Sequence, residues 1–414
     1  MTVDIVGAGF SGLVTAFYLT EKGVVPRVFE KERRPGGLIS TKRMPSGLIE
    51  TAANAFLNSD LVEEMAAKIG LDLLATKHEA RTRFIYRGRP RRWPLSVRAS
   101  GRVAFALSKI VLKSKEVRPE EGETIREWGV RILGKEGTRY LLEPALQGIY
   151  AGDPTEMSAS LILSKFLSRG KRKKPKIFGS VSPPEGMGQF IDKLEKYLVT
   201  KGVEFKYSST LKAADYGVLK TTEVATKAAD SGTDPGVSPA REISKVIYCG
   251  SARGAAEWLR EAAPVTARAL SKIDVRPVTT ITAFFEPHAA DVTGFGILFP
   301  RDQDFQALGV LFNGHIFEGR SALRSETWIY SGVDAGLESV ISDRKKLGGW
   351  GNPIEFEITR WPHAIPHYTV DLEALLRTGI ELPPNIKLVG NYLGDLGLTK
   401  ILDRAKRTVD EILK

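Results

Sequence analysis

Hydrophobic residues near the start of the chain change from a strand pattern to a helical one and back. Residues 2–6 form a short apolar run, residues 13–22 follow with helical spacing, and residues 27–29 form a second short run. Apolar positions recur with helical spacing again in residues 61–69. We therefore predict a strand–helix–strand unit, which is a βαβ unit, followed by a further helix.

Beyond residue 76 the pattern predicts a helical segment and, later, a β-rich segment. After each of them the chain is expected to rejoin the βαβ unit. Helical spacing covers residues 103–112, 124–133, 137–146, 158–167 and 189–200. Strand patterns cover residues 203–207, 216–220, 243–249, 279–285, 308–312, 327–330 and 386–389, and a polar loop covers residues 228–239. A last helix is apolar at Leu398, Ile401, Leu402, Ala405, Val409 and Ile412. We expect an α/β fold in which a discontinuous Rossmann-like domain carries two insertions.

Composition narrows the chemistry that the chain can perform. Its 414 residues, 42% hydrophobic and 26% charged, are typical of a globular protein with more than one domain. The one cysteine, Cys249, excludes a disulfide framework and a thiolate zinc site. His363 and His367 are separated by Pro366, which argues against a helical metal pair, so we expect no metal site. The longest uncharged run, residues 5–20, lacks the preceding basic residues of a secretory signal, so we expect a cytoplasmic protein.

Positive charge is concentrated in two stretches. The net charge is +11, residues 81–118 contain twelve Lys/Arg and one acid, and six of the eight residues 169–176 are basic. This concentration predicts contact with an anionic ligand or an anionic surface such as the inner face of a membrane. The basic stretches lack interleaved aromatic residues in a strand pattern, so we predict no nucleic-acid partner.

The first strand ends in a glycine fingerprint. Gly7, Gly9 and Gly12 form G-x-G-x-x-G at the start of the first helix, and Glu30 ends the second strand. Gly7 permits the tight turn, Gly9 lets a pyrophosphate approach the backbone, and Gly12 lets helix and strand pack closely. Glu30 is placed to accept from a ribose hydroxyl, and its charge disfavours the 2′-phosphate of NADP. The sequence predicts a dinucleotide site.

A second glycine pair indicates which dinucleotide is bound. Gly36 and Gly37 follow Glu30 closely, where NAD dehydrogenases need no such pair. An FAD needs one, because its pyrophosphate and ribityl chain run on past the first glycine turn. We therefore predict noncovalently bound FAD.

Five further motifs are spread over most of the chain. They are R-F-I-Y at 83–86 leading to W-P-L-S-V-R at 93–98, G-I-Y-A-G-D-P at 148–154, G-F-G-I-L-F-P at 294–300, I-P-H-Y-T at 365–369 and G-N-Y-L-G-D-L-G-L at 390–398. In this order they resemble the oxygen-dependent protoporphyrinogen oxidases, within the wider flavin amine oxidase and phytoene desaturase fold. The chain departs from that family at residues 50–54, which read E-T-A-A-N where E-x-G-P is usual.

The resemblance implies three domains. Residues 1–76, 184–255 and 382–414 correspond to an FAD-binding domain. Residues 77–90, 176–183 and 256–381 correspond to a substrate-binding domain with a mixed sheet. Residues 91–175 correspond to a helical insertion that faces a membrane or gates the substrate.

The resemblance also implies the site residues. It places Arg98 against a propionate of the substrate and Phe295, Leu298 and Ile329 in an apolar wall. It implies that the helix beginning near Gly397 points its positive end at the flavin. No catalytic side chain is expected, because the flavin performs the chemistry. Adding the glycine turns, the expected cofactor contacts are Gly7, Ala8, Gly9, Phe10, Ser11, Gly12, Glu30, Lys31, Gly36, Gly37, Leu38, Ala52, Ala53, Asn54, Leu211, Trp361, Gly390, Leu396, Gly397 and Leu398.

The function implied by the resemblance is oxidation of protoporphyrinogen IX to protoporphyrin IX in haem biosynthesis, with oxygen as electron acceptor. Three alternatives stay open at this point: oxidation of coproporphyrinogen III, with four propionates in place of two, amine oxidation, and carotenoid desaturation. A homodimer and peripheral contact with a membrane are compatible with the sequence.

Overall fold

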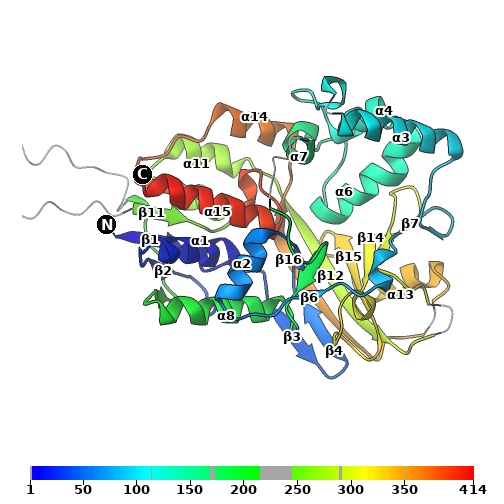
Figure 1. Cartoon of the computed structure of the whole chain (residues 1–414), viewed down its shortest axis with the longest axis horizontal. Coiled ribbons are helices and arrows are strands. Elements are labelled where there is room, and N and C mark those ends of the chain that lie inside the picture. Colours follow the sequence, from blue (N-terminus) through cyan, green and yellow to red (C-terminus); the bar gives the residue numbers. More distant parts are fainter. Residues whose placement is uncertain (1, 113, 168–172, 215–244, 289–290, 350) are drawn as a thin grey trace, which may run out of the picture.

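A five-stranded parallel sheet is built around the N-terminal strand–helix–strand unit (Figure 1). This computed structural model describes residues 2–112, 114–167, 173–214, 245–288, 291–349 and 351–414. The strands in sheet order are β10 (Glu204–Lys206), β2 (Arg27–Phe29), β1 (Val3–Val6), β11 (Lys245–Tyr248) and β17 (Ile386–Leu388), all parallel. They come from the start, the middle and the end of the chain, so the expected discontinuous α/β unit is confirmed.

Helices cover both faces of the parallel sheet. On one face lie α1 (Phe10–Glu21), α2 (Asp60–Lys68), α8 (Met187–Thr200) and α15 (Leu398–Ile412), and on the other lie α10 (Ala252–Trp258) and α11 (Pro264–Ser271). The strands have apolar residues on both faces. In β11, Ile247 packs with α1, whereas Val246 and Tyr248 pack with α10 and α11. Burial on both faces is what a parallel sheet needs.

A seven-stranded mixed sheet forms the second layer of the molecule. Its strands in order are β16 (Glu355–Pro366), β12 (Val275–Phe285), β15 (Arg324–Ser331), β14 (Ala307–Phe312), β13 (Gly296–Leu298), β7 (Phe84–Tyr86) and β8 (Pro90–Arg91). All neighbours are antiparallel except β13 and β7. Short strands complete the β structure: β3 (Thr41–Met44) with β4 (Gly47–Glu50), and β9 (Ser180–Ser182) between β5 (Phe56–Leu57) and β6 (Leu74–Ala75).

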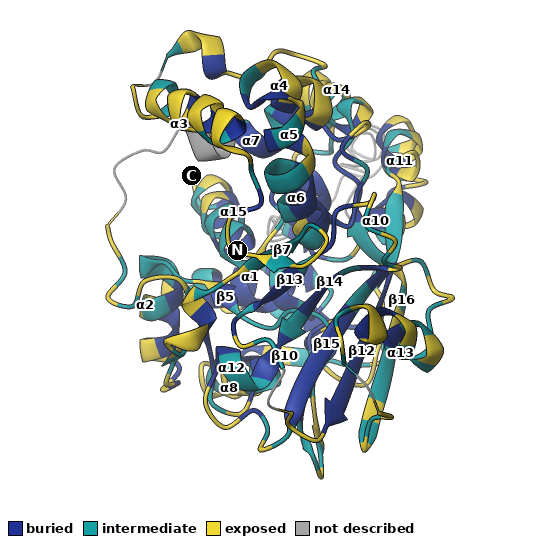
Figure 2. Ribbon diagram, turned by 90° about the vertical axis from the view of Figure 1, so that its right-hand side faces the viewer, coloured by how far each residue is buried: buried dark blue, intermediate teal, exposed yellow. Residues whose placement is uncertain are grey.

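The two faces of the mixed sheet have different partners, because side chains alternate along each strand. Ile281 of β12, Val310 of β14 and Trp328 of β15 pack in one cluster with α13 (Leu337–Lys346). Their neighbours Thr280, Leu311 and Ile329 face the opposite side and line the large cavity described below. The central strands are largely buried in Figure 2.

The helical insertion lies above the mixed sheet in Figures 1 and 2. It contains α3 (Val97–Val111), α4 (Ile125–Ile132), α5 (Gly134–Gly137), α6 (Glu143–Tyr150) and α7 (Ala159–Leu167). Leu372 of α14 (Val370–Thr378) and Tyr368, just before that helix, pack with them. The sequence predicted four of the elements here, with two errors in their bounds.

The first error concerns α3, which begins at Val97 and not at residue 103. Ser96 caps the helix, since its hydroxyl accepts from the Ala99 N–H at 3.3 Å and donates to Glu136 at 2.7 Å. The apolar periodicity did not reveal the first turn, because Val97 is 92% exposed and is not part of the buried face of the helix.

The second error concerns the helix expected at residues 137–146. The chain there continues from α5 through a π-helical turn (Thr138–Leu142) into α6, which ends at Tyr150. Pro144 lies in the first turn of α6, where its missing N–H costs least. The strand expected at residues 216–220 and the loop at 228–239 lie outside the described residues.

The division into three domains stays a prediction. The packing places α11 with the parallel sheet, although its residues were assigned to the substrate-binding part, because Ala267 and Leu270 are buried with Val246 and Ile386. No helix in the described part of the chain is long and apolar enough to span a membrane.

Candidate active site

One cavity of about 2850 Å³ runs from the carboxyl ends of the parallel strands to the open face of the mixed sheet. Ligands bind at this edge in open α/β sheets, because the strand order reverses there and helices begin there. The volume exceeds that of an ordinary small-molecule pocket, at about 300–1,000 Å³. It is large enough for a dinucleotide and a second large molecule.

Two glycine turns meet at the start of the cavity. The Gly36 N–H donates to the Ala8 carbonyl at 2.8 Å, and Gly9 pairs with Gly36 as an isolated parallel bridge. A Cβ on Gly37 would lie 3.3 Å from the Cα of Gly9, so side chains here would fill the gap between the turns. Backbone atoms therefore face the cavity from both sides.

The packing of α1 against β1 also requires glycine. A Cβ on Gly12 would lie 1.8 Å from the Gly7 carbonyl oxygen, a distance no side chain can occupy. Gly7 itself has φ +101°, a conformation that favours glycine. This geometry agrees with the tight turn predicted at Gly7 and the close packing predicted at Gly12.

Glu30 holds the first glycine turn from the end of β2. One carboxylate oxygen accepts from the Ala8 N–H at 2.6 Å and the other from the Glu32 N–H at 2.9 Å. The side chain is 7% exposed and lines the cavity. Each oxygen keeps a lone pair with which to accept from a ribose hydroxyl.

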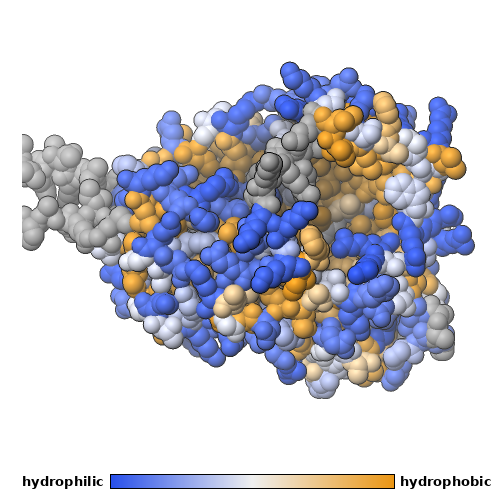
Figure 3. All heavy atoms as spheres, viewed as in Figure 1, coloured by the Kyte–Doolittle hydropathy of each residue, from blue (hydrophilic) through white to orange (hydrophobic). Residues whose placement is uncertain are grey.

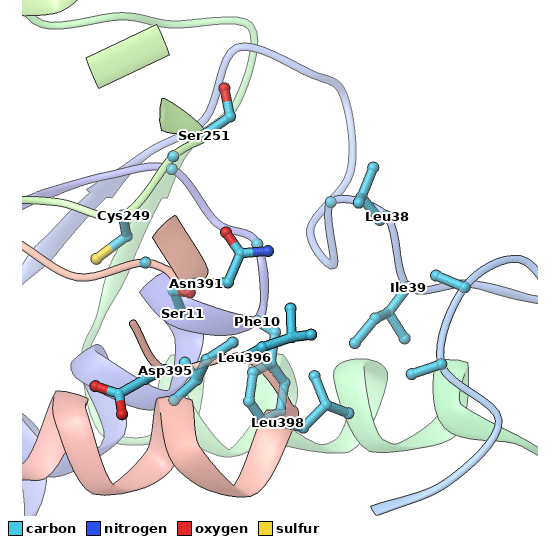
Figure 4. Close-up of a pocket in the computed structure, with 18 of the residues that line it drawn as sticks. Phe10, Ser11, Leu38, Ile39, Cys249, Ser251, Asn391, Asp395, Leu396 and Leu398 are labelled. Atoms are coloured by element: carbon cyan, nitrogen blue, oxygen red, sulfur yellow. The ribbon is translucent and has the colours of Figure 1, made fainter. Parts of the chain in front are cut away.

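Most of the predicted cofactor residues line this one cavity. Figure 4 shows Leu38 and Ile39 on one side, Cys249 and Ser251 on the other, and Phe10, Leu396 and Leu398 between them. The cavity-lining residues of the predicted set are Gly7, Gly9, Phe10, Ser11, Glu30, Lys31, Gly36, Gly37, Leu38, Ala52, Ala53, Asn54, Leu211, Trp361, Gly390, Leu396, Gly397 and Leu398. Ala8 and Gly12 lie behind the first turn and do not line the cavity.

Two elements close the cavity from later in the chain. Trp361 of β16 donates from its indole N–H to the Thr51 carbonyl at 2.7 Å, which joins the mixed sheet to the segment before Ala52. The helix α15 begins at Gly397 with no side-chain cap and no acid in its first turn. The positive end of its dipole therefore offers positive potential to the cavity.

The far end of the cavity has an apolar wall. Val278, Thr280, Leu311 and Ile329 lie on the open face of the mixed sheet, and Phe295 precedes β13. Of the predicted wall, Phe295 and Ile329 line the cavity, whereas Leu298 does not. Leu298 instead packs beside Gly148 of α6, where an added Cβ would lie 2.7 Å from the leucine Cδ2.

The predicted anchor Arg98 does not line the cavity. It lies exposed in the first turn of α3. Arg83, which the sequence analysis used only as part of a motif, lines the cavity and places its guanidinium carbon 4.5 Å from the centroid of the Phe295 ring. The two residues precede β7 and β13, which pair in parallel, and the Phe295 N–H donates to the Thr82 carbonyl at 2.8 Å. No local sequence signal shows that pairing.

Burial keeps two titratable groups beside the cavity, the Cys249 thiol and the Tyr150 phenol, in their neutral forms. Burial raises the pKa of the Cys249 thiol to about 12, so this thiol supplies no thiolate nucleophile. Burial, reinforced by the Asp395 carboxylate, raises the pKa of Tyr150 to about 12. Among the described residues, no three His, Cys, Asp or Glu side chains converge as a metal site.

The comparisons with known proteins agree with the fold and the cavity. The family model for flavin-containing amine oxidoreductases matches residues 10–398. A chloroplastic protoporphyrinogen oxidase from Oryza sativa subsp. japonica is 25% identical over 99% of this chain and 87% of that protein. The coproporphyrinogen III oxidase from Bacillus subtilis (strain 168) is 23% identical over 99% of this chain and 97% of that protein.

Solved structures share the fold. A putative protoporphyrinogen oxidase from Exiguobacterium sp. 255-15 superposes with a TM-score of 0.72 at 20% identity, over 99% of this chain and 98% of that one. A putrescine oxidase variant superposes with a TM-score of 0.69 at 12% identity, over 100% of this chain and 99% of that one.

The chain belongs to the flavin-containing amine oxidoreductase family. It is an FAD-dependent oxidoreductase, and the family resemblance, the fold class and the cofactor predicted from the sequence are confirmed.

The contact between the glycine turns generates a first prediction. Gly9→Asp is expected to purify without flavin, because a carboxylate at this position would face the pyrophosphate. Gly9→Ala is the control, since its φ of −66° suits alanine and the added Cβ lies 3.9 Å from Gly37. Visible absorbance measures bound flavin and circular dichroism measures folding. A folded Gly9→Asp protein with a full complement of FAD would show that the pyrophosphate lies elsewhere.

Proposed function

We propose that this enzyme oxidises protoporphyrinogen IX to protoporphyrin IX, with molecular oxygen as electron acceptor. The observation that carries the proposal is the apolar face of the mixed sheet, which shares one cavity with the glycine turns and lies near an arginine, Arg83, that also lines the cavity. An apolar macrocycle with carboxylate side chains matches such a chamber. The names of the relatives from rice and Bacillus subtilis support a porphyrinogen substrate.

The residues around the glycine turns fit an FAD. We assign the pyrophosphate to the part of the cavity that the backbone of Gly9 and Gly37 lines, the ribose hydroxyls to Glu30, and the edge of the flavin ring to the start of α15 after Gly397. The positive potential of a helix N-terminus stabilises negative charge on a reduced ring. Oxidation of the porphyrinogen removes six electrons and six protons, and three oxygen molecules accept them as hydrogen peroxide. When bound, FAD supplies this redox chemistry.

The chain's own side chains bind and orient the substrate. The wall formed by Val278, Leu311 and Ile329 excludes water from one face of the macrocycle. Arg83 holds a propionate, because its planar guanidinium binds a carboxylate with two hydrogen bonds and stays charged. The Phe295 ring, whose centroid lies 4.5 Å from the guanidinium carbon, attracts the cation and favours this position of it. No described side chain has to act as nucleophile, in keeping with the neutral state of Cys249.

Oxidation of coproporphyrinogen III is the second candidate. The Bacillus subtilis relative favours it, as does the surplus of basic residues in the middle of the chain. It requires binding partners for four propionates. Among the described residues, Arg83 is the arginine that we place beside the apolar wall. One arginine can pair with one propionate, so this arrangement favours the substrate with fewer carboxylates.

Turnover tests the proposal directly. The FAD-loaded enzyme is incubated in air with each porphyrinogen, and porphyrin fluorescence and hydrogen peroxide are followed. We expect three peroxide molecules for each protoporphyrin formed, with the higher kcat/KM for protoporphyrinogen IX. Preference for coproporphyrinogen III would support the second candidate, and turnover of neither would reject both.

Arg83 and Arg98 form a matched pair for a second test. Arg83→Ala is expected to raise KM about tenfold or more, because loss of a hydrogen bond to a charged group costs about 1.5–3 kcal/mol. Arg98→Ala is expected to change KM less than about twofold, since this residue is exposed outside the cavity. Flavin content should stay the same in both. The reverse result would restore Arg98 as the propionate anchor.

We also propose that the enzyme associates peripherally with the cytoplasmic face of a membrane. The tract at residues 169–176, on which this prediction rested, is only partly described. Support comes from α3, which exposes Val97, Phe105, Val111 and its C-terminal neighbour Leu112 on one broad face, with Phe105 62% exposed. Arg98 and Arg102 are exposed on the same helix. Apolar side chains beside cations are typical of a helix lying in an anionic interface.

Vesicle sedimentation measures this association. The protein is expected to bind vesicles with anionic lipid, to leave them at high salt, and to stay in solution with neutral vesicles. Phe105→Asp/Val111→Asp should weaken binding without changing turnover of substrate added in detergent. A protein that stays in the supernatant with anionic vesicles at low salt would exclude the membrane contact.

A further inference from the structure

Two lysines lie on the rim of the active-site cavity. Lys173 and Lys174, in the described segment that leads to β9, are exposed and line the cavity. Lys176, two residues further on, is equally exposed but does not line it. The cavity opens on this side of the molecule, where Figure 3 shows a hollow with hydrophobic residues in its floor.

The segment that follows the two lysines is anchored to the body of the protein. The N–H groups of Lys176 and Ile177 donate to the two carboxylate oxygens of Glu63 in α2, each at 2.9 Å. The Asn58 side-chain amide donates to the Ile177 carbonyl at 2.7 Å. These bonds start within two residues of Lys174, so they keep the lysines beside the cavity.

The two ammonium groups are available to a ligand. Within the described part of the chain, no carboxylate lies within ion-pair distance of Lys173 or Lys174. The acid from the neighbouring element that also lines the cavity is Asp60, and its carboxylate accepts from the Leu61 N–H at 3.0 Å at the start of α2. Glu63 is engaged by the backbone, as described above. The rim therefore carries two positive charges that no described partner neutralises.

Lysine and arginine suit different steps of carboxylate binding. A lysine ammonium on its flexible stem attracts a carboxylate without demanding a fixed geometry, whereas the stacked guanidinium of Arg83 demands one. Charges at the mouth of a low-dielectric cleft focus the field and raise the association rate of an oppositely charged ligand. The two lysines at the rim and Arg83 in the chamber are therefore arranged as an entry site followed by a final binding site.

We propose that Lys173 and Lys174 form an entry site that attracts the carboxylates of the tetrapyrrole before the ring reaches the chamber with Arg83. This proposal rests on the proposed function, since it assumes a substrate with carboxylate side chains. It adds a second determinant of specificity, because a substrate with four carboxylates gains more from the rim than one with two.

The test compares Lys173→Gln/Lys174→Gln with Lys176→Gln, using the FAD-loaded enzyme. At low ionic strength the double variant is expected to lose about fivefold or more in kcat/KM, with kcat and flavin content unchanged. The loss should be larger for coproporphyrinogen III than for protoporphyrinogen IX. It should shrink at 1 M salt, where the Debye length is about 3 Å. Lys176→Gln should change kcat/KM less than about twofold.

A substrate without carboxylates distinguishes loss of charge attraction from damage to the fold of the double variant. With a porphyrinogen dimethyl ester, the double variant should match the wild type, because no carboxylate is present to attract. An equal loss with the ester, or a wild-type kcat/KM for the free acid at low salt, would overturn the entry site.

A binding measurement keeps this proposal separate from the proposed function. Binding of protoporphyrin itself to the holoenzyme, followed by fluorescence, needs no turnover. Failure of the wild type to oxidise either porphyrinogen would reject the proposed function alone. Equal protoporphyrin affinity of the wild type and the double variant at low salt would reject the entry site, whatever the activity.

Discussion

The active-site cavity depends on the close approach of two glycine turns. The Gly36 N–H donates to the Ala8 carbonyl, and a Cβ on Gly37 would lie only 3.3 Å from the Cα of Gly9, so the two turns are in close contact. The carboxylate of Glu30 fixes the first turn by accepting from the Ala8 N–H. Because backbone atoms and not side chains form this end of the cavity, a large anionic cofactor can lie against both turns.

The rest of the cavity follows from the alternation of side chains in the mixed sheet. Trp328 packs against the cluster under α13, so its neighbour Ile329 must face the cavity. A bond from the Trp361 indole to the Thr51 carbonyl joins this sheet to the glycine-turn side. The apolar chamber and the cofactor site are therefore adjacent, which is the condition for electron transfer from a ring to the flavin.

Local sequence patterns predicted helices and strands better than they predicted which side chains lie together. The helix at Leu61 and the strands around Ile329 follow from periodicity alone, because the apolar residues that each element buries recur at regular spacing in the sequence. The start of α3 was not predicted because Val97 is exposed and therefore does not continue the buried apolar face of the helix. Arg98 was chosen as the anchor from its place in a motif, whereas the pairing of β7 with β13 brings Arg83 and Phe295 to the cavity wall.

The sequence by itself determined the class of the protein, the cofactor and the two glycine turns. Those features depend on residues close together in the chain: Gly7 needs a positive φ, Gly12 cannot carry a Cβ, and Glu30 follows the second strand. Only the tertiary structure decided which cations face the cavity. The chain has 60 Lys and Arg residues, and the sequence does not show which of them can contact a ligand in the cavity. Arg83 and Lys174 line the cavity, whereas Arg98 and Lys176 do not, and this difference depends on contacts between distant parts of the chain.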